Sequence, residues 1–132
     1  FLLSSVLVGV VAQRLVRKNC IHCGVDDVLQ DDEVLALRIK GARGRSLKVR
    51  RGVGCIKCRY TGYRGRTGLY EVMPVTPRIG SLVHQESSSA EIKREALNDG
   101  MLTLREYGIK KIAFGETTFD EVMAVTDDRS VF

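Results

Sequence analysis

Four cysteines in two Cys-x-x-Cys pairs are the residues whose types and spacing could do chemistry. Cys20 and Cys23 form the first pair, and Cys55 and Cys58 form the second. Two thiolates three positions apart in a tight turn can face the same ion, and two such turns complete a tetrahedron. Four soft ligands with no open position are the donor set of a structural zinc site. The sequence therefore predicts one structural zinc ion held by these four side chains.

Glycines stand beside both pairs and favour tight turns there. Gly24 follows the first pair and Gly54 precedes the second, and a glycine relieves the backbone where a turn folds back on its metal. Structural zinc contributes an apparent binding free energy of about 10–16 kcal/mol in small modules, whereas a whole small domain is stable by about 5–15 kcal/mol. We therefore expect the metal to hold residues 20–58 in place, while the helices that follow have apolar faces of their own.

Other interpretations of the four cysteines are weaker. A redox dithiol of the thioredoxin type uses a single pair at the start of a helix that follows a strand. Two disulfides require an oxidising compartment, and the sequence has no export signal. An iron–sulfur cluster also takes four cysteines, but paired turns more often hold zinc. His22 is interpreted as a solvent-facing spacer, and His84 as a surface residue on a helix.

The spacing of apolar residues along the chain predicts the helices and strands that must position the cysteines. Apolar residues at helical spacing predict a helix over residues 5–18, and Val34, Leu35 and Leu37 predict a short helix that ends near Gly41. Leu47 and Val49 alternate with basic residues, which indicates a short half-exposed strand, and residues 66–75 are strand-like as well.

Capping signals predict a string of short helices in the last third of the chain. Thr76 followed by Pro77 is a helix start, and Gly100 and Gly115 stand where two helices should end. Three capping boxes recur: Ser88 with Glu91, Thr103 with Glu106, and Thr118 with Glu121. The expected fold class is α+β, with a small zinc-binding lobe of short strands followed by a bundle of short helices.

Composition excludes several classes of protein. The chain has 132 residues, of which 44% are hydrophobic and 28% charged, so it is globular rather than disordered. The apolar run at residues 1–12 is shorter than the roughly 20 residues of a spanning helix, and its flanks do not fit a signal peptide. Because Phe1 is not a natural start, we expect a fragment of a longer protein.

The sequence contains no recognisable set of catalytic residues. No Gly-x-x-x-x-Gly-Lys-Ser/Thr loop for phosphates is present. Two histidines and four cysteines committed to metal leave little for nucleophilic or acid–base chemistry. We therefore expect that this chain is not an enzyme by itself.

Several segments, in order along the chain, carry a resemblance to a known family. They are Ala12–Arg17, the first Cys-x-x-Cys pair, Gly54–Cys58, Thr61–Glu71, Gly100–Arg105 and Thr117–Val122. In this order they resemble the C-terminal region of the ATPases of bacterial type II secretion and type IV pilus assembly. The resemblance covers nearly the whole chain. Many family members carry a proline within the first pair, where this chain has Ile21 and His22, but the ligands are unaffected.

The resemblance implies a RecA-like P-loop ATPase whose phosphate-binding loop lies upstream of this chain. Such proteins form hexameric rings in the cytoplasm, peripheral to the inner membrane, and hydrolyse ATP with Mg²⁺. Residues 1–19 would end the ATPase core, residues 20–75 would form the zinc-binding lobe, and residues 76–132 the C-terminal helical lobe. Pilus retraction ATPases lack the four cysteines, which favours an assembly or export motor.

The resemblance also implies partners. They are the ATPase core of the same chain, neighbouring subunits of the ring and the inner-membrane assembly platform. Gln13, Arg14 and Arg17 are the candidates for contacts back to the core, although arginines near a helix end more often cap carbonyls or lie in solvent.

Two other functions compete with the motor hypothesis. A zinc-ribbon nucleic-acid module is supported by the net charge of +5, by the basic run at residues 38–51, and by Tyr60 and Tyr63 beside the second pair. The aromatic residues do not interleave with the bases as a stacking platform would, which argues against nucleic acid. Chaperone zinc modules repeat the Cys-x-x-Cys turn four times, and this chain has two such turns.

The basic residues are expected to share one surface if zinc compacts residues 20–58. Lys57, Arg59, Arg64 and Arg66 continue the basic run. Such a surface attracts acidic partners over about 8–10 Å in physiological salt: an acidic protein face, the acidic stretch at residues 26–33 of a neighbouring subunit, or anionic lipid head groups. A solvated face without a partner is the competing interpretation.

Overall fold

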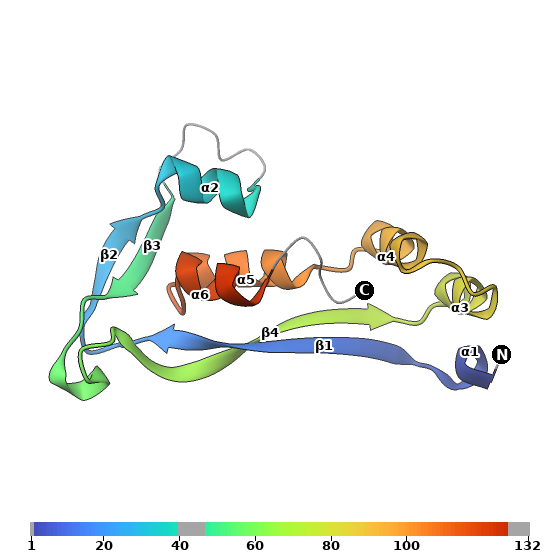
Figure 1. The fold of residues 1–132 in the computed structure, drawn as a ribbon, viewed down its shortest axis with the longest axis horizontal. Coiled ribbons are helices and arrows are strands. Elements are labelled where there is room, and N and C mark those ends of the chain that lie inside the picture. The colour runs from blue at the N-terminus through green and yellow to red at the C-terminus, as the bar shows by residue number, and fades with distance from the viewer. Residues whose placement is uncertain (1, 40–46, 127–132) are drawn as a thin grey trace.

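The structure is a computed structural model that describes residues 2–39 and 47–126. Within them the chain is α+β, as predicted, with two antiparallel two-stranded sheets and a series of short helices (Figure 1). The elements are α1 (Leu2–Val6), β1 (Gly9–Asn19), β2 (Gly24–Val28), α2 (Asp31–Leu37), β3 (Lys48–Gly52), the 3-10 helix η1 (Ile56–Cys58), β4 (Tyr63–Pro74), α3 (Pro77–His84), α4 (Ser89–Asn98), α5 (Leu104–Ala113) and α6 (Phe119–Val125).

A long ribbon of β1 and β4 forms the base of the molecule (Figure 1). The helix predicted over residues 5–18 is therefore wrong, because β1 occupies Gly9–Asn19 and only Leu2–Val6 is helical before it. Ala12 and Val16 are the buried apolar residues of β1, and a spacing of four fits a strand face as well as a helix face. Pairing with β4 over nearly the whole strand decides in favour of the strand.

A second, shorter ribbon pairs β2 with β3 and rises at an angle from the end of the first (Figure 1). The strand predicted near Val49 is confirmed as β3, whereas α2 ends at Leu37, before the predicted end near Gly41, which lies outside the described residues. Arg50 pairs with Asp26 at 2.6 Å and Arg51 with Asp27 at 2.9 Å. Part of the basic run thus faces the acidic stretch of the same hairpin.

The helices of the last third begin where the capping signals predicted. The hydroxyls of Thr76, Ser88, Thr103 and Thr118 each accept a hydrogen bond from the third backbone N–H of their helix. The reciprocal bond of a capping box forms between Glu106 and Thr103. Each cap satisfies one of the backbone donors that a helix start leaves open.

One apolar core connects both ribbons with the helices. Val16 of β1, Leu69 of β4, Leu37 of α2, Leu104 of α5 and Val122 of α6 belong to it. It thus draws on residues 1–19, 20–75 and 76–132 alike, and the three-part division of the chain stays a prediction. A separate apolar cluster joins α3 and α4 to β4 and consists of Met73, Ile79, Ala96 and Met101.

A buried carboxylate fixes α5 to the long ribbon. The side chain of Glu71 in β4 is fully buried, and its Oε1 accepts a hydrogen bond from the backbone N–H of Leu104 at 3.0 Å. This bond satisfies one of the backbone N–H groups that the start of α5 leaves without a partner in the helix. The helices of the described residues are all too short or too polar to span a bilayer.

Two helical glycines give a matched test of this packing. Alanine normally stabilises a helix over glycine by roughly 0.5–1 kcal/mol. At Gly80 in α3 the nearest atoms to an added Cβ are 3.9 Å away, so Gly80→Ala should stabilise the protein by that amount. At Gly108 in α5 the Cβ would lie 2.6 Å from Cγ1 of the buried Val122. Gly108→Ala should therefore destabilise the protein by about 1–3 kcal/mol, as measured by denaturant unfolding. Equal effects of the two substitutions would contradict the close contact of α5 and α6.

Candidate metal centre

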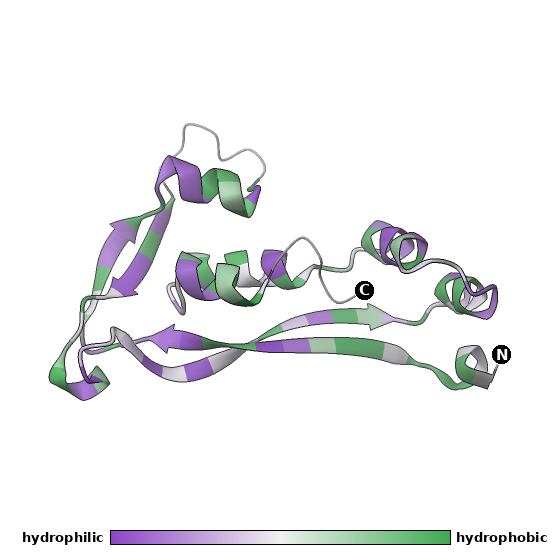
Figure 2. Cartoon of the chain, viewed as in Figure 1, coloured by the Kyte–Doolittle hydropathy of each residue, from purple (hydrophilic) through white to green (hydrophobic). Residues whose placement is uncertain are grey.

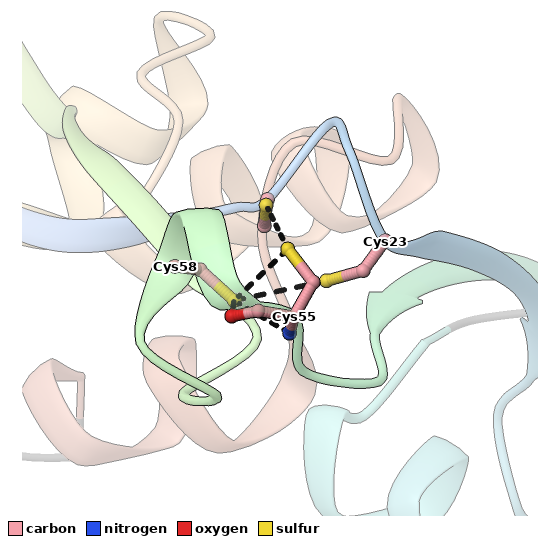
Figure 3. A group of neighbouring side chains, drawn as sticks. Cys23, Cys55 and Cys58 are labelled. Atoms are coloured by element: carbon pink, nitrogen blue, oxygen red, sulfur yellow. Dashed lines mark hydrogen bonds between the residues drawn. The ribbon is translucent and has the colours of Figure 1, made fainter.

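The structure brings the four cysteine sulfurs together (Figure 3). They lie at the corner of the fold where the two ribbons meet, next to η1 (Figure 1). All four sulfurs lie within 4.8 Å of one another. The Sγ atoms of Cys20 and Cys55 are 3.8 Å apart, as are those of Cys23 and Cys58. All four residues are free thiols. Their role as metal ligands stays a prediction, but their convergence is a finding.

The donor set and its spacing fit a single tetrahedral ion. Zinc–sulfur bonds of about 2.3 Å in a tetrahedron place neighbouring sulfurs about 3.8 Å apart. Three of the sulfur pairs lie at 3.7–3.8 Å. A disulfide would require about 2.05 Å. Cys20 and Cys58 are buried, and the other two are half-buried, so the centre is closed on most sides.

Backbone amides point at two of the sulfurs. The N–H groups of Cys55 and Gly62 donate to Sγ of Cys58 at 3.2 and 3.3 Å, and the N–H of Gly54 donates to Sγ of Cys23 at 3.3 Å. Burial raises the pKa of the Cys58 thiol, but the two amide donors, together with hydrogen bonds from the thiols of Cys55 and Cys23, outweigh burial and lower the pKa to about 6. Burial raises the pKa of Cys23 to about 11, because its single amide offsets less. Cys58 is therefore the sulfur that these donors favour as a thiolate.

Two glycines let the backbone segments cross beside the sulfurs. A Cβ on Gly52 would lie 2.1 Å from the carbonyl oxygen of Gly62, and one on Gly62 would lie 2.4 Å from that of Gly52. The same Gly62 carbonyl accepts from the N–H of Cys20 at 2.9 Å. Gly54, predicted to relieve the turn before Cys55, has a φ of 104°, which favours glycine. The close approach of Gly52 to Gly62 was not predicted, because no local signal shows that the two residues meet.

A buried asparagine ties the helices to this corner. Asn19 immediately precedes Cys20, and its side-chain amide donates to the carbonyls of Arg50, Gly115 and Thr117 at 2.9, 3.0 and 3.3 Å. Its backbone N–H also donates to the carbonyl of Glu116 at 2.8 Å. The loop between α5 and α6 is thereby fixed next to the first cysteine. Sequence reasoning missed Asn19, because its partners lie far away along the chain.

Arg17 bonds to the C-terminal helices of its own chain. Its guanidinium pairs with the carboxylate of Glu121 at 2.9 Å and lies 4.2 Å from the ring centroid of Tyr63. The hydroxyl of Tyr63 lies 2.7 Å from that of Thr118 at the start of α6. Burial raises the pKa of Glu121, but its bonds with Arg17 outweigh burial and lower it. Glu121 thus turns to Arg17 rather than closing the predicted capping box.

The other predicted contact residues lie at the surface. Gln13 and Arg14 are exposed on β1, and Arg14 donates to the backbone carbonyl of Gln13 at 2.9 Å. Their contact with an ATPase core stays a prediction. His22 is exposed and its Nε2 lies 3.0 Å from a guanidinium nitrogen of Arg64, outside the sulfur group, and His84 is exposed as well.

Fold and site together define a small α+β module with a tetracysteine centre. Comparison with known proteins shows which family contains such a module. A family profile described as "Type II/IV secretion system protein" matches residues 1–124. The type IV pilus assembly ATPase PilB of Thermus thermophilus is 41% identical over 127 residues, which are 96% of this chain and 14% of the relative. The type II secretion system protein HxcR of Pseudomonas aeruginosa is 39% identical over 97% of this chain and 23% of its own length.

The type II secretion system protein E of Dickeya dadantii is also 39% identical, over 97% of this chain and 25% of its own length. The chain therefore belongs to the type II/IV secretion system protein family, as the resemblance predicted. It spans a quarter or less of the length of these curated relatives.

The crossing of Gly52 and Gly62 can be tested against a glycine that has room. Gly62 and Gly100 both have a left-handed φ, of 82° and 96°, but no atom lies within 4 Å of a Cβ added at Gly100. Gly100→Ala should cost only the backbone strain, about 1–3 kcal/mol. Gly62→Ala adds a clash with backbone and should cost more and also weaken metal binding, measured by unfolding and by competition with a chelator. Unchanged metal affinity in Gly62→Ala would show that the crossing does not shape the centre.

Proposed function

We propose that this chain is the zinc-binding and helical region of an ATPase that powers type II secretion or type IV pilus assembly. The observation that carries the proposal is the family match over residues 1–124, in a chain whose four cysteine sulfurs lie within 4.8 Å of one another. The relatives are named as a pilus assembly ATPase and as type II secretion system proteins. ATP with Mg²⁺ is bound and hydrolysed elsewhere in the longer protein, of which this chain is the C-terminal region.

Zinc is the metal that the donor set fits best. Cys20, Cys23, Cys55 and Cys58 would hold it, and four thiolates leave no open position for a water or a substrate. When bound, zinc supplies cross-links between the two turns and no chemistry of its own. The amides of Cys55 and Gly62 favour the thiolate that such an ion needs.

The wider assignments rest on the family. The longer protein forms a hexameric ring in the cytoplasm at the inner membrane, and its partners are its own ATPase core, the neighbouring subunits and the assembly platform. The four cysteines favour assembly or export over retraction. The zinc-ribbon nucleic-acid module is not favoured, since the relatives are secretion and pilus proteins and Arg50 and Arg51 already pair with aspartates.

Metal analysis tests the centre directly. Protein purified without chelator should contain one zinc per chain, and its four thiols should titrate only after unfolding or chelation. Cys55→Ser should lose the zinc and speed hydrogen exchange in residues 20–28 and 48–62. Exchange should change least in α3 and α4, whose apolar cluster contains no residue of the metal centre. Four freely titrating thiols in folded, metal-free protein would refute the zinc assignment.

A genetic experiment tests the motor assignment. Cys20→Ser with Cys23→Ser, placed in the longer protein in its own bacterium, should abolish secretion or piliation although the protein is still made. Leu35→Ser, at an exposed position on α2, is the control and should have no effect. The isolated 132-residue chain should show no ATP turnover. Normal secretion or piliation without the cysteines, or turnover by the isolated chain, would contradict the proposal.

A further inference from the structure

A cavity of about 190 Å³, here called the hairpin cavity, lies between the β2–β3 hairpin and the start of α6. Figure 1 shows α6 within the angle that the two ribbons form. Val28 and Val49 of the hairpin and Ile112 and Phe119 of the helices supply the apolar part of its wall. Pockets for small-molecule ligands measure roughly 300–1,000 Å³. The hairpin cavity is therefore too small for a typical cofactor and suits one long side chain.

The polar part of the wall carries a net negative charge. Arg50 and Arg51 are its bases, and they already pair with two aspartates of the hairpin at 2.6 and 2.9 Å. The carboxylates of Glu33 and Asp120 also line the cavity, and neither forms an ion pair within the described part of the chain. Figure 2 shows the first turn of α2, which carries Glu33, as hydrophilic.

This charge is opposite in sign to that of the whole chain. With the two paired aspartates counted, the region has four acids and two bases, and its formal charge is −2. The chain as a whole has a net charge of +5. An acidic cavity on a basic protein attracts a cation at that place and repels it from most of the remaining surface.

The hydroxyl groups of the wall already have partners. The hydroxyl of Thr61 donates to a backbone carbonyl at 2.8 Å, and the hydroxyls of Tyr63 and Thr118 lie 2.7 Å from each other. The carboxylate of Glu33 accepts one hydrogen bond, from the backbone N–H of Gln30 at 2.8 Å, and a carboxylate has lone pairs for about four. The open groups are therefore acceptors, so a ligand must supply hydrogen-bond donors as well as positive charge.

We propose that the hairpin cavity is a docking site for an arginine side chain of a partner protein. The aliphatic stem of the arginine packs against Val28, Val49 and Phe119, as long cationic side chains do on apolar surface. Its guanidinium meets the carboxylates of Glu33 and Asp120. Arginine suits this wall because its planar head has five N–H donors, is weakly hydrated and stacks on aromatic rings.

A polypeptide carries this arginine, rather than a free amino acid. Free arginine would bring its own carboxylate to an acidic wall, whereas an arginine within a chain has none. Because the cavity holds only a side chain, the backbone of the partner stays outside and adds contacts of its own. The proposal goes beyond the motor function and does not depend on it, since an arginine can bind here without ATP turnover.

Two capped amino acids separate charge from shape in the test. N-acetyl-arginine amide carries the guanidinium without a backbone charge, and N-acetyl-citrulline amide has nearly the same shape without the charge. Each is titrated into the isotope-labelled 132-residue chain, purified without chelator, and followed by NMR. The arginine compound should shift the backbone resonances of Val28, Thr118 and Asp120 most, and added salt should weaken the effect. The citrulline compound should leave these resonances in place.

Matched variants locate the groups that bind. Glu33→Gln and Asp120→Asn should each weaken binding of the arginine compound by roughly two- to fivefold, the usual size for a partly exposed charge pair. Glutamine can keep the bond of Glu33 to its helix start. Asp31→Asn removes a charge from the same turn of α2, outside the cavity wall, and should bind as the parent does.

A further variant tests the shape of the hairpin cavity. Val28 is 42% exposed on β2, and Val28→Phe fills the cavity while the charges stay the same. It should abolish binding of the arginine compound. Denaturant unfolding is measured for every variant, so that loss of the fold is recognised.

Four outcomes would overturn the proposal. They are equal shifts with the citrulline compound, equal weakening by Asp31→Asn and Asp120→Asn, undiminished binding by folded Val28→Phe, and shifts of the same resonances when the chain alone is diluted. The last would assign the hairpin cavity to a second copy of this chain. Failure here leaves the motor assignment standing, since secretion and ATP turnover are measured separately.

Discussion

The convergence of four sulfurs within 4.8 Å is the constraint on which the rest of the structure depends. Two turns that approach so closely must share their space by backbone crossing, which Gly52 and Gly62 allow. Four thiolates at this distance repel one another unless a cation lies among them. Two-stranded sheets are marginal by themselves in water, and both ribbons begin or end at this corner. The ion would therefore stabilise the angle between the ribbons as well as the turns themselves.

Local signals in the sequence predicted the features that local interactions determine. The capping hydroxyls of Ser88, Thr103 and Thr118 accept the expected bonds because their partners are three residues away. The paired spacing of the cysteines identified the candidate centre for the same reason. Strand β1 was missed because the interval between Ala12 and Val16 fits helix and strand alike, and only pairing with β4 decides. Periodicity is judged from one short segment at a time, so it cannot show the pairing of two strands that lie far apart along the chain.

Contacts between distant segments escaped prediction for a different reason. Asn19 bonds to carbonyls in β3 and beyond α5, and Glu71 caps a helix that begins far along the chain. Neither residue stands out from other polar residues in its local sequence. Each becomes important because the fold buries it, and a buried polar group needs hydrogen-bond partners. The charges behave similarly. The acidic stretch and the basic run are separate segments of the sequence, but β2 and β3 bring Asp26 to Arg50 and Asp27 to Arg51.

Asn19 and Arg17 have a mechanical consequence. Both residues lie on β1, and between them they bond to the loop after α5, to β3 and to α6. A displacement of α6 is thus carried into β1 by short hydrogen bonds and a charge pair rather than through a slack connection. Asn19 directly precedes Cys20, so these bonds couple the position of the helices to the first cysteine turn.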